Sequence, residues 1–168
     1  MPKIIENLRA RLLEEARRQV EASGYAALTV RSVAEGCGVG VGTVYNYFPS
    51  KDALVAGFML EDWQRCMQVV TAAGGTEQTP MPVALCIYNQ LREFAGLYAF
   101  LFRDAAAAAG FSGSFGKYHG VLRAQIAAPL SRFCSDGFTA EFVAEALLTW
   151  TMAGKSFDEL GRLIEKLF

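Results

Sequence analysis

The sequence predicts an all-α protein in which a three-helix N-terminal domain precedes a larger helical bundle. Three observations favour this fold class. Apolar residues recur every three or four positions through most of the 168-residue chain. Glycines, prolines and hydroxyl side chains separate these periodic stretches. No stretch has the alternating, β-branched pattern that is typical of a strand.

The first helix is expected to begin near Ile4 and to end at Gly24, which supplies a typical C-terminal stop. Its apolar residues recur every four positions, at Leu8, Leu12, Ala16 and Val20. Charged residues cover the other faces of this helix. The pattern therefore predicts one buried stripe along a helix that is otherwise exposed to solvent.

Two short helices are expected next, separated by a glycine turn. Thr29 is a good N-cap for the first of them, and Gly38 can take the positive φ of a tight turn. The second short helix is expected to run from about Val41 to Tyr47. Packed under the first helix, the pair predicts a helix-turn-helix. A helical hairpin in an unrelated bundle fits the same pattern, so both interpretations stay open at this level.

The rest of the chain is expected to form longer helices. Ser50 caps a long fourth helix, and a connector rich in Gly, Thr and Pro is expected over Ala73–Pro82. Further helices are expected at 82–95, 97–109, 115–134, 140–153 and 157–167, with breaks at Gly96, 110–116 and 135–139. These boundaries predict a helix-turn-helix domain at residues 1–50 and a second helical domain at residues 51–168.

Composition and charge exclude several classes of protein. Hydrophobic residues make up 52% of the chain and charged residues 20%, which indicates a globular chain with a buried interface, an apolar cavity, or both. The net charge is −1, so any attraction to nucleic acid has to be local. Residues 1–52 hold seven basic and six acidic residues, a weak bias in the direction that DNA binding needs.

The sequence does not favour a secreted protein, a membrane protein or an enzyme. No secretory signal and no long apolar stretch is visible, and the four scattered cysteines indicate reduced thiols in a cytoplasmic protein. The chain lacks hydrolase, zinc-protease, P-loop and dinucleotide-binding motifs, and its single histidine leaves few acid–base options. We therefore expect no enzymatic activity, no cofactor and no metal site.

Residues 29–54 carry the most specific pattern, TVRSVAEGCGVGVGTVYNYFPSKDAL. A Thr-capped helix, a glycine turn, the stretch G-T-V-Y-N-Y-F and then S-K-D-A-L resemble the signature of the tetracycline-repressor (TetR) family. The resemblance covers residues 4–60; beyond them only length and helical character match. It implies an N-terminal helix-turn-helix DNA-binding domain, followed by a helical-bundle domain for ligand binding and dimerisation.

The resemblance also implies which residues meet DNA. Thr29, at a helix N-terminus, is expected to hold a phosphate with its hydroxyl and with backbone N–H groups. The start of the third helix is expected to face base edges, and the tyrosines and the lysine to contact phosphates. The full set is Thr29, Arg31, Val41, Gly42, Thr43, Tyr45, Asn46, Tyr47 and Lys51. Arg31 is equally well interpreted as a solvated surface charge.

Two glycines depart from the usual family pattern. Gly40 stands where a Ser or Thr cap is common, and Gly36 stands where alanine would serve better. Each helical glycine costs roughly 0.5–1 kcal/mol relative to alanine. Val41 and Gly42 also offer no side-chain hydrogen bonds. Direct base readout is therefore expected to be thin, with the remaining selectivity coming from Asn46 or from DNA shape.

The second domain is expected to bind a ligand and to dimerise. An aromatic-rich set is expected to line a pocket for a small, largely apolar or aromatic ligand, although aromatics at helical spacing are more often plain core. The pocket set is Trp63, Met67, Tyr88, Arg92, Tyr98, Phe102, Phe115, Tyr118 and His119. The set expected at the dimer interface is Phe142, Ala146, Leu147, Trp150, Leu160 and Ile164.

Taken with the resemblance, these features predict a cytoplasmic, dimeric transcription regulator. Its expected partners are a palindromic double-stranded operator, a second copy of the chain and a small effector that releases the DNA. The alternative is a helical ligand-binding or scaffold protein without DNA affinity. Neither the operator, the effector nor the regulated genes follow from the sequence.

Overall fold

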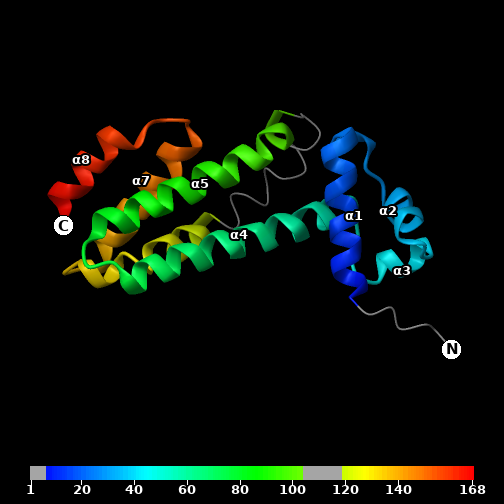
Figure 1. The fold of residues 1–168 in the computed structure, drawn as a ribbon, viewed down its shortest axis with the longest axis horizontal. Helices are drawn as coiled ribbons and strands as arrows, with labels where there is room; N and C mark the ends of the chain where they lie inside the picture. The colour runs from blue at the N-terminus through cyan, green and yellow to red at the C-terminus, as the bar shows by residue number, and fades with distance from the viewer. Residues whose placement is uncertain (1–6, 104–118) are drawn as a thin grey trace. The chain divides into compact units, whose positions relative to one another are not determined.

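The computed structural model describes residues 7–103 and 119–168, and the predicted all-α fold is confirmed over these residues, which contain no strand (Figure 1). The chain divides into two compact units. The first unit contains the chain through Asp62, and the second contains most of the chain from Trp63 onward. The expected breaks at 110–116 lie outside the described residues.

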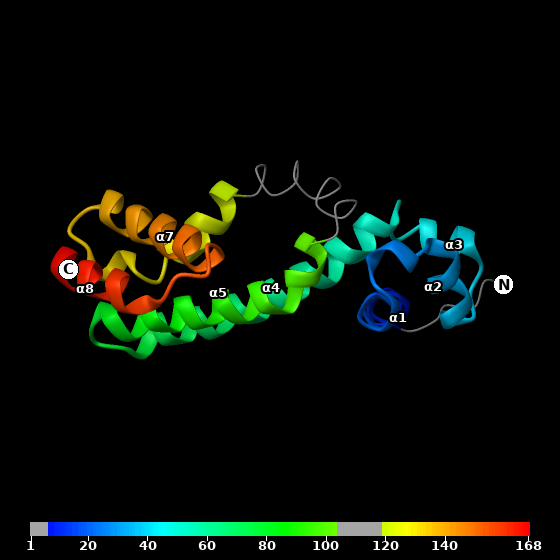
Figure 2. The same ribbon diagram turned by 90° about the horizontal axis from the view of Figure 1, so that it is seen from above.

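The first unit contains α1 (Leu8–Ser23), the short helix η1 (Tyr25–Ala27), α2 (Val30–Cys37), α3 (Val41–Tyr45) and the start of α4. The expected stripe on α1 is buried, and Gly24 ends the helix with a φ of 80°. Gly38 takes a φ of 66° between α2 and α3, as the turn requires. The predicted helix-turn-helix is confirmed, and Figure 2 shows α2 and α3 beside α1, which is viewed nearly along its axis.

Buried apolar residues from every helix of the first unit form its core. Val33 of α2, Val44 of α3 and Leu54 of α4 are fully buried. Phe48 anchors the segment between α3 and α4 and is 5% exposed. Ser50 caps α4 as predicted, because its Oγ accepts a hydrogen bond of 3.1 Å from Ala53 N. The first unit thus includes the start of α4, although the sequence places the domain boundary at residue 50.

The second unit is a helical bundle. Its elements are the rest of α4 (Lys51–Thr76), most of α5 (Pro80–Arg103), a helical stretch at 119–127, η2 (Ser131–Phe133), α7 (Gly137–Met152) and α8 (Phe157–Leu167). α4 and α5 run side by side in both views (Figures 1 and 2). The core is built from α4, α5, α7, α8 and the stretch 119–127, with residues such as Val70, Ile87, Ile126 and Leu147.

Several expected boundaries are wrong. α4 continues to Thr76 and α5 begins at Pro80, so the connector is much shorter than Ala73–Pro82. α5 passes through Gly96 without a break, because the buried residues Leu91 and Tyr98 hold the helix on both sides. The described part of the next helix, from residue 119 onward, ends at 127 in a turn and η2 rather than reaching Cys134. α7 starts at Gly137 because Asp136 caps it, and α8 has its predicted bounds.

Within residues 7–103 and 119–168, no helix is long and apolar enough to cross a membrane. The four cysteines are free thiols. Burial raises the pKa of each thiol above its usual value, which disfavours the reactive thiolate.

Candidate nucleic-acid interface

The exposed face of the first unit carries most of the residues expected to contact DNA. Thr29, Arg31, Gly42, Tyr45, Asn46 and Tyr47 are exposed, and Val41, Thr43 and Lys51 are half-buried. Tyr45 and Tyr47 keep 54% and 48% of their surface accessible. Val44 and Phe48, which alternate with them, face the core. Two large aromatic side chains are therefore presented to solvent beside the helix that opens with Val41.

α3 is short, and no side chain caps its N-terminus. Gly40 accepts the first hydrogen bonds of the helix through its carbonyl, at 2.9 Å from Thr43 N and 3.4 Å from Val44 N. A Cβ on Gly42 would meet nothing within 4 Å, so this surface is open. The helix therefore presents a small, smooth surface at its start and hydroxyl and amide groups behind it.

Lys51 lies at the start of α4, where its charge is held in place. Its Nζ is 4.1 Å from the centroid of the Tyr25 ring and donates to Tyr25 O at 3.3 Å. The Tyr25 hydroxyl in turn donates to the Asp52 carboxylate. A cation resting on an aromatic face keeps its remaining N–H groups for other acceptors. This arrangement suits a contact with a fixed anion such as a phosphate.

The N-terminus of α2 is closed by a capping box. Thr29 Oγ1 accepts a hydrogen bond of 2.9 Å from Ser32 N, and the Ser32 hydroxyl accepts one of 3.2 Å from Thr29 N. The predicted Thr29 cap is confirmed. The Thr29 hydroxyl keeps its own proton for donation, and the first N–H groups of a helix have no acceptor within the helix. This helix end is thus chemically able to hold an anion.

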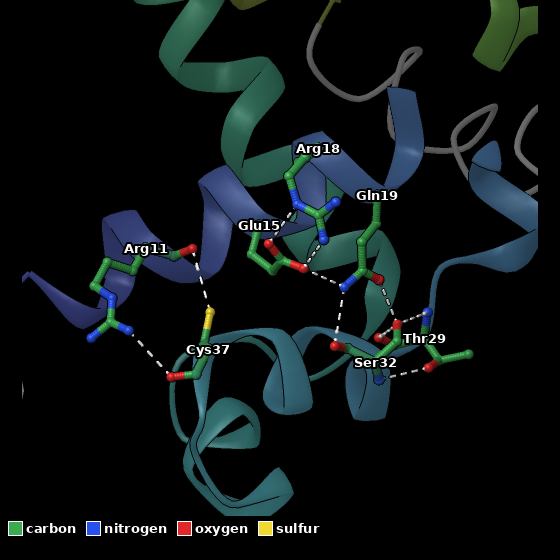
Figure 3. Close-up of polar contacts among 7 residues, drawn as sticks. All are labelled: Arg11, Glu15, Arg18, Gln19, Thr29, Ser32 and Cys37. Atoms are coloured by element: carbon green, nitrogen blue, oxygen red, sulfur yellow. Dashed lines mark hydrogen bonds and ion pairs between the residues drawn. The ribbon is translucent and has the colours of Figure 1, made fainter. Parts of the chain in front are cut away.

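Polar side chains on α1 hold α2 at both ends, a feature that the sequence analysis missed (Figure 3). Gln19 Nε2 donates to Ser32 O at 3.0 Å, and Ser32 Oγ lies 2.6 Å from Gln19 Oε1. At the other end, Arg11 donates to Cys37 O at 3.2 Å, and Cys37 Sγ lies 3.6 Å from Arg11 O. The spacing of Arg11 and Gln19, two turns apart along one face, is the only signal the sequence held.

Gly36 lies against a side chain of α1, a contact that the sequence analysis did not include. A Cβ at this position would overlap the Glu15 carboxylate, which lies against α2. That carboxylate accepts hydrogen bonds from Arg18 at 2.6 and 2.9 Å and from Gln19 at 2.7 Å. These bonds, first from Arg18 and then from Gln19, lower the pKa of Glu15 to about 2. An alanine at this position would therefore have to displace the Glu15 side chain from its hydrogen bonds.

The residues expected to bind a ligand separate into two groups. Trp63 and Tyr98 are buried and contact Phe94, with ring centroids 5.5 and 4.9 Å away, and Trp63 Nε1 donates to Gln125 Oε1 at 2.6 Å. Tyr88 contacts Phe157 instead, at 5.3 Å, and donates to Lys155 O at 2.8 Å.

The other expected ligand residues vary in position. Met67 packs against the core, Arg92 is exposed with its guanidinium 5.9 Å from the Tyr88 ring, and His119 Nε2 lies 2.9 Å from a Glu145 oxygen. Phe115 and Tyr118 lie outside the described residues, as does the side chain of Phe102.

The six residues expected at the dimer interface also differ in burial. Leu147, Leu160 and Ile164 are buried in the core of the second unit. Phe142 is 53% exposed, and Ala146 and Trp150 are partly exposed. The sequence analysis missed Phe138, which is 77% exposed and stacks on Phe142 with ring centroids 6.1 Å apart. The signal in the sequence was its position four residues before Phe142, which places both rings on the same face of a helix.

A groove of about 430 Å³ adjoins this surface. Its lining consists of Trp150 from α7 and Glu159, Leu160, Arg162, Leu163 and Lys166 from α8. Two of these six, Trp150 and Leu160, are among the residues expected at the dimer interface.

Comparisons with known proteins agree with the motif in α1 to α4. Residues 12–57 match the family of bacterial regulatory proteins of the tetR type. The repressor KstR of Mycolicibacterium smegmatis is 32% identical over 109 residues, which cover 60% of this chain and 53% of KstR. The regulator UidR of Escherichia coli is 30% identical over 59 residues, 35% of this chain and 30% of UidR. The matches thus span about half of these relatives or less.

Solved structures share the fold over nearly the whole chain. The TetR family repressor AlkX from Dietzia has a TM-score of 0.64 and 15% identity, covering 96% of this chain and 93% of that one. The repressor FadR of Thermus thermophilus, solved with lauroyl-CoA, has a TM-score of 0.63 and 19% identity, covering 95% and 92%. The helix-turn-helix geometry and the match at residues 12–57 show that this part of the chain is a DNA-binding domain of the tetR type, and the solved structures show that the chain shares the fold of TetR-family repressors.

Proposed function

We propose that this protein is a dimeric transcriptional repressor that binds a palindromic operator and releases it when a small apolar or aromatic effector binds the second unit. The observation that carries the proposal is the exposure of Tyr45, at the end of α3, and of Tyr47, in the turn that follows it, together with the Lys51 ammonium held on the Tyr25 ring at the start of α4. The family match over residues 12–57 supports the same function.

DNA binding divides between anchoring and readout. Thr29, Tyr45, Tyr47 and Lys51 anchor the first unit to phosphates, and Arg31 is an additional candidate. The start of α3 enters the major groove, with Val41, Gly42 and Thr43 toward the bases and Asn46 behind them. Because this surface offers few side-chain donors, DNA shape contributes much of the selectivity.

Dimerisation is supported by the exposed apolar surface on α7. Phe138 and Phe142 are unusually exposed for large aromatic side chains, and the groove beside Trp150 adjoins charged groups of both signs from α8. A two-fold dimer that pairs these surfaces brings two reading heads to two half-sites of one operator. Phe138, Phe142, Ala146 and Trp150 form the contact in this proposal, with Leu147, Leu160 and Ile164 beneath it.

Effector binding is assigned to the aromatic residues of the second unit. Trp63, Met67, Tyr88, Arg92, Tyr98, Phe102, Phe115, Tyr118 and His119 remain the candidate set. A ligand that binds one arrangement of α4 better than another changes the population of DNA-competent protein. FadR, a protein of the same fold, was solved with a fatty-acyl ligand, which supports an apolar class of effector. We propose a cytoplasmic location and no enzymatic activity.

The experiment that tests this proposal is selection of bound duplexes from a random DNA library, repeated at two salt concentrations. The expected result is one enriched palindrome whose affinity falls steeply with salt, since anchoring by several phosphate contacts releases counterions. Replacement of both Tyr47 and Lys51 by alanine should abolish the enrichment, and Leu85→Ala on α5 serves as a surface control. A library that yields no enriched sequence at low salt contradicts DNA binding and favours the scaffold function.

A further inference from the structure

The amide of Gln19 lies at the centre of a polar cluster between α1 and α2 (Figure 3). Its Oε1 lies 2.6 Å from Ser32 Oγ, and its Nε2 donates to Ser32 O at 3.0 Å. The same Nε2 donates to Glu15 Oε1 at 2.7 Å. Both ends of the Gln19 amide are therefore used, and two of its three bonds reach a single residue of α2.

Ser32 is the residue that completes the Thr29 cap. Its backbone N–H donates to Thr29 Oγ1, and its hydroxyl accepts from Thr29 N. Gln19 thus contacts the carbonyl and the hydroxyl of the residue on which the geometry of Thr29 depends. The Gln19 amide is therefore connected to the exposed Thr29 hydroxyl through one intermediate residue, Ser32.

Glu15 fixes the orientation of the Gln19 amide. Its carboxylate is paired with Arg18 and lies against Gly36, where α2 has no side chain. The acceptor oxygen on Glu15 requires the nitrogen of Gln19 to face it, which leaves the Gln19 oxygen for Ser32. Gly36 and Gln19 are therefore linked through Glu15, which contacts both.

We propose that Gln19 is a positioning residue for DNA binding, which sets the N-terminus of α2 so that Thr29 and the first N–H groups of α2 meet a phosphate. Gln19 itself is half-buried behind α2 and does not contact the DNA. The inference rests on the proposed function, because the phosphate contact at Thr29 belongs to it. It adds Gln19, a residue that lies outside the recognition surface, to the residues that determine the affinity for DNA.

α2 is held by other contacts when Gln19 is changed. Val33 and Ala34 are 0% and 1% exposed, and the Arg11–Cys37 contacts hold the opposite end of the helix. Loss of the Gln19 bonds is therefore expected to loosen the N-terminal turn of α2 while the helix stays packed. A purely structural role would lower stability without acting on one particular phosphate contact.

The test uses Gln19→Met, which keeps the length and helical preference of the side chain and removes its hydrogen bonds. Affinity for the selected operator is measured for the unsubstituted chain, for each single variant, Gln19→Met and Thr29→Ala, and for the double variant. Gln68→Met, at an exposed position of α4, is the matched control. The expected result is a loss of affinity of about tenfold for Gln19→Met, and little further loss when it is added to Thr29→Ala.

A second readout follows the helix end directly. Hydrogen exchange at the amides of Ser32 and Val33 should be faster in Gln19→Met than in the wild type, with the exchange of α1 and of α4 unchanged. This measurement also shows whether the variant is folded.

Two outcomes would overturn the inference while leaving DNA binding intact. One is unchanged affinity in Gln19→Met; the other is a loss that adds fully to that of Thr29→Ala, which indicates general destabilisation. Wild-type protein that binds no duplex would instead contradict the proposed function, and the positioning role with it.

Discussion

The guanidinium of Arg17 on α1 holds the carboxylate of Asp62 on α4 through two hydrogen bonds, of 2.6 and 3.0 Å. The same group donates to Phe58 O at 3.3 Å and lies 4.9 Å from the centroid of the Phe58 ring. The Asp62 side chain is only 5% exposed, whereas that of Arg17 is 27% exposed. Arg17 therefore neutralises a buried carboxylate at the end of the first unit.

Replacing Arg17 with methionine should lower the free energy of unfolding by about 2–4 kcal/mol, because the buried Asp62 carboxylate loses the two charge-assisted hydrogen bonds from Arg17. The double variant Arg17→Met, Asp62→Leu should recover most of this loss, since both charges are then absent. Urea denaturation followed by circular dichroism measures both effects. Arg9→Met is the matched control: its pair with Glu61 is 3.1 Å long but largely exposed, and its loss should cost less than about 1 kcal/mol. Equal losses in the two single variants would contradict this account.

Gly36→Ala should destabilise the protein by about 1–2 kcal/mol, because the new methyl group displaces the Glu15 carboxylate from its hydrogen bonds. Gly42→Ala provides the contrast, since a Cβ there meets nothing and alanine favours a helix by about 0.5–1 kcal/mol. Thermal unfolding of the two variants should therefore shift in opposite directions. Removing the obstruction with Glu15→Ala should reduce the penalty of Gly36→Ala, and failure of this rescue would place the strain elsewhere.

The low pKa of Glu15 predicts an acid dependence of stability. Its folded-state pKa of about 2 lies below the usual value in an unfolded chain, so its contribution is complete above about pH 5 and is lost as the pH falls toward 2. Glu15→Gln should accordingly be less stable than the wild type at pH 7, by about 1 kcal/mol after allowance for screening by solvent. The difference should shrink between pH 5 and pH 2. A difference independent of pH would show that the charge on Glu15 is not the cause.

Replacing Phe138 and Phe142 together by glutamate should disrupt the proposed dimer. Each phenyl ring contributes about 1.5–3 kcal/mol when fully buried, so the dimer dissociation constant should rise at least a hundredfold. Sedimentation velocity at several concentrations measures the change. Leu85→Glu places the same charge at another exposed apolar position, on α5, and should leave association unchanged. A double variant that sediments as the wild type does would require a different interface.

The cap positions were predictable because their signals are local. Thr29, Ser50 and Gly38 act within one turn of their own positions, through a hydroxyl that reaches a nearby N–H or through a φ that glycine adopts freely. Exposure of Tyr45 and Tyr47 followed from the family motif rather than from periodicity.

Features that depend on distant residues were missed or misjudged. Gly36 looks unfavourable in its own helix, and its contact with the Glu15 side chain is not visible in the sequence. Gly96 looks like a break, yet packing of α5 on both sides outweighs its low helix propensity. Likewise, Leu147 is buried and Phe142 is exposed because only one face of α7 meets the core of the second unit. The candidate ligand set shows the same difficulty, since aromatic periodicity does not distinguish a pocket from close packing.

The two tryptophans of the chain, Trp63 and Trp150, both lie in the second unit, and the first unit has only tyrosines at Tyr25, Tyr45 and Tyr47. Indole emission therefore reports on the second unit alone when tyrosine is not excited. Trp63, packed against Phe94 and bonded to Gln125, is shielded from an aqueous quencher, while Trp150 lines the open groove. The proposed effector site near Trp63 and the proposed dimer contact near Trp150 can thus be followed by separate optical signals in the unlabelled protein.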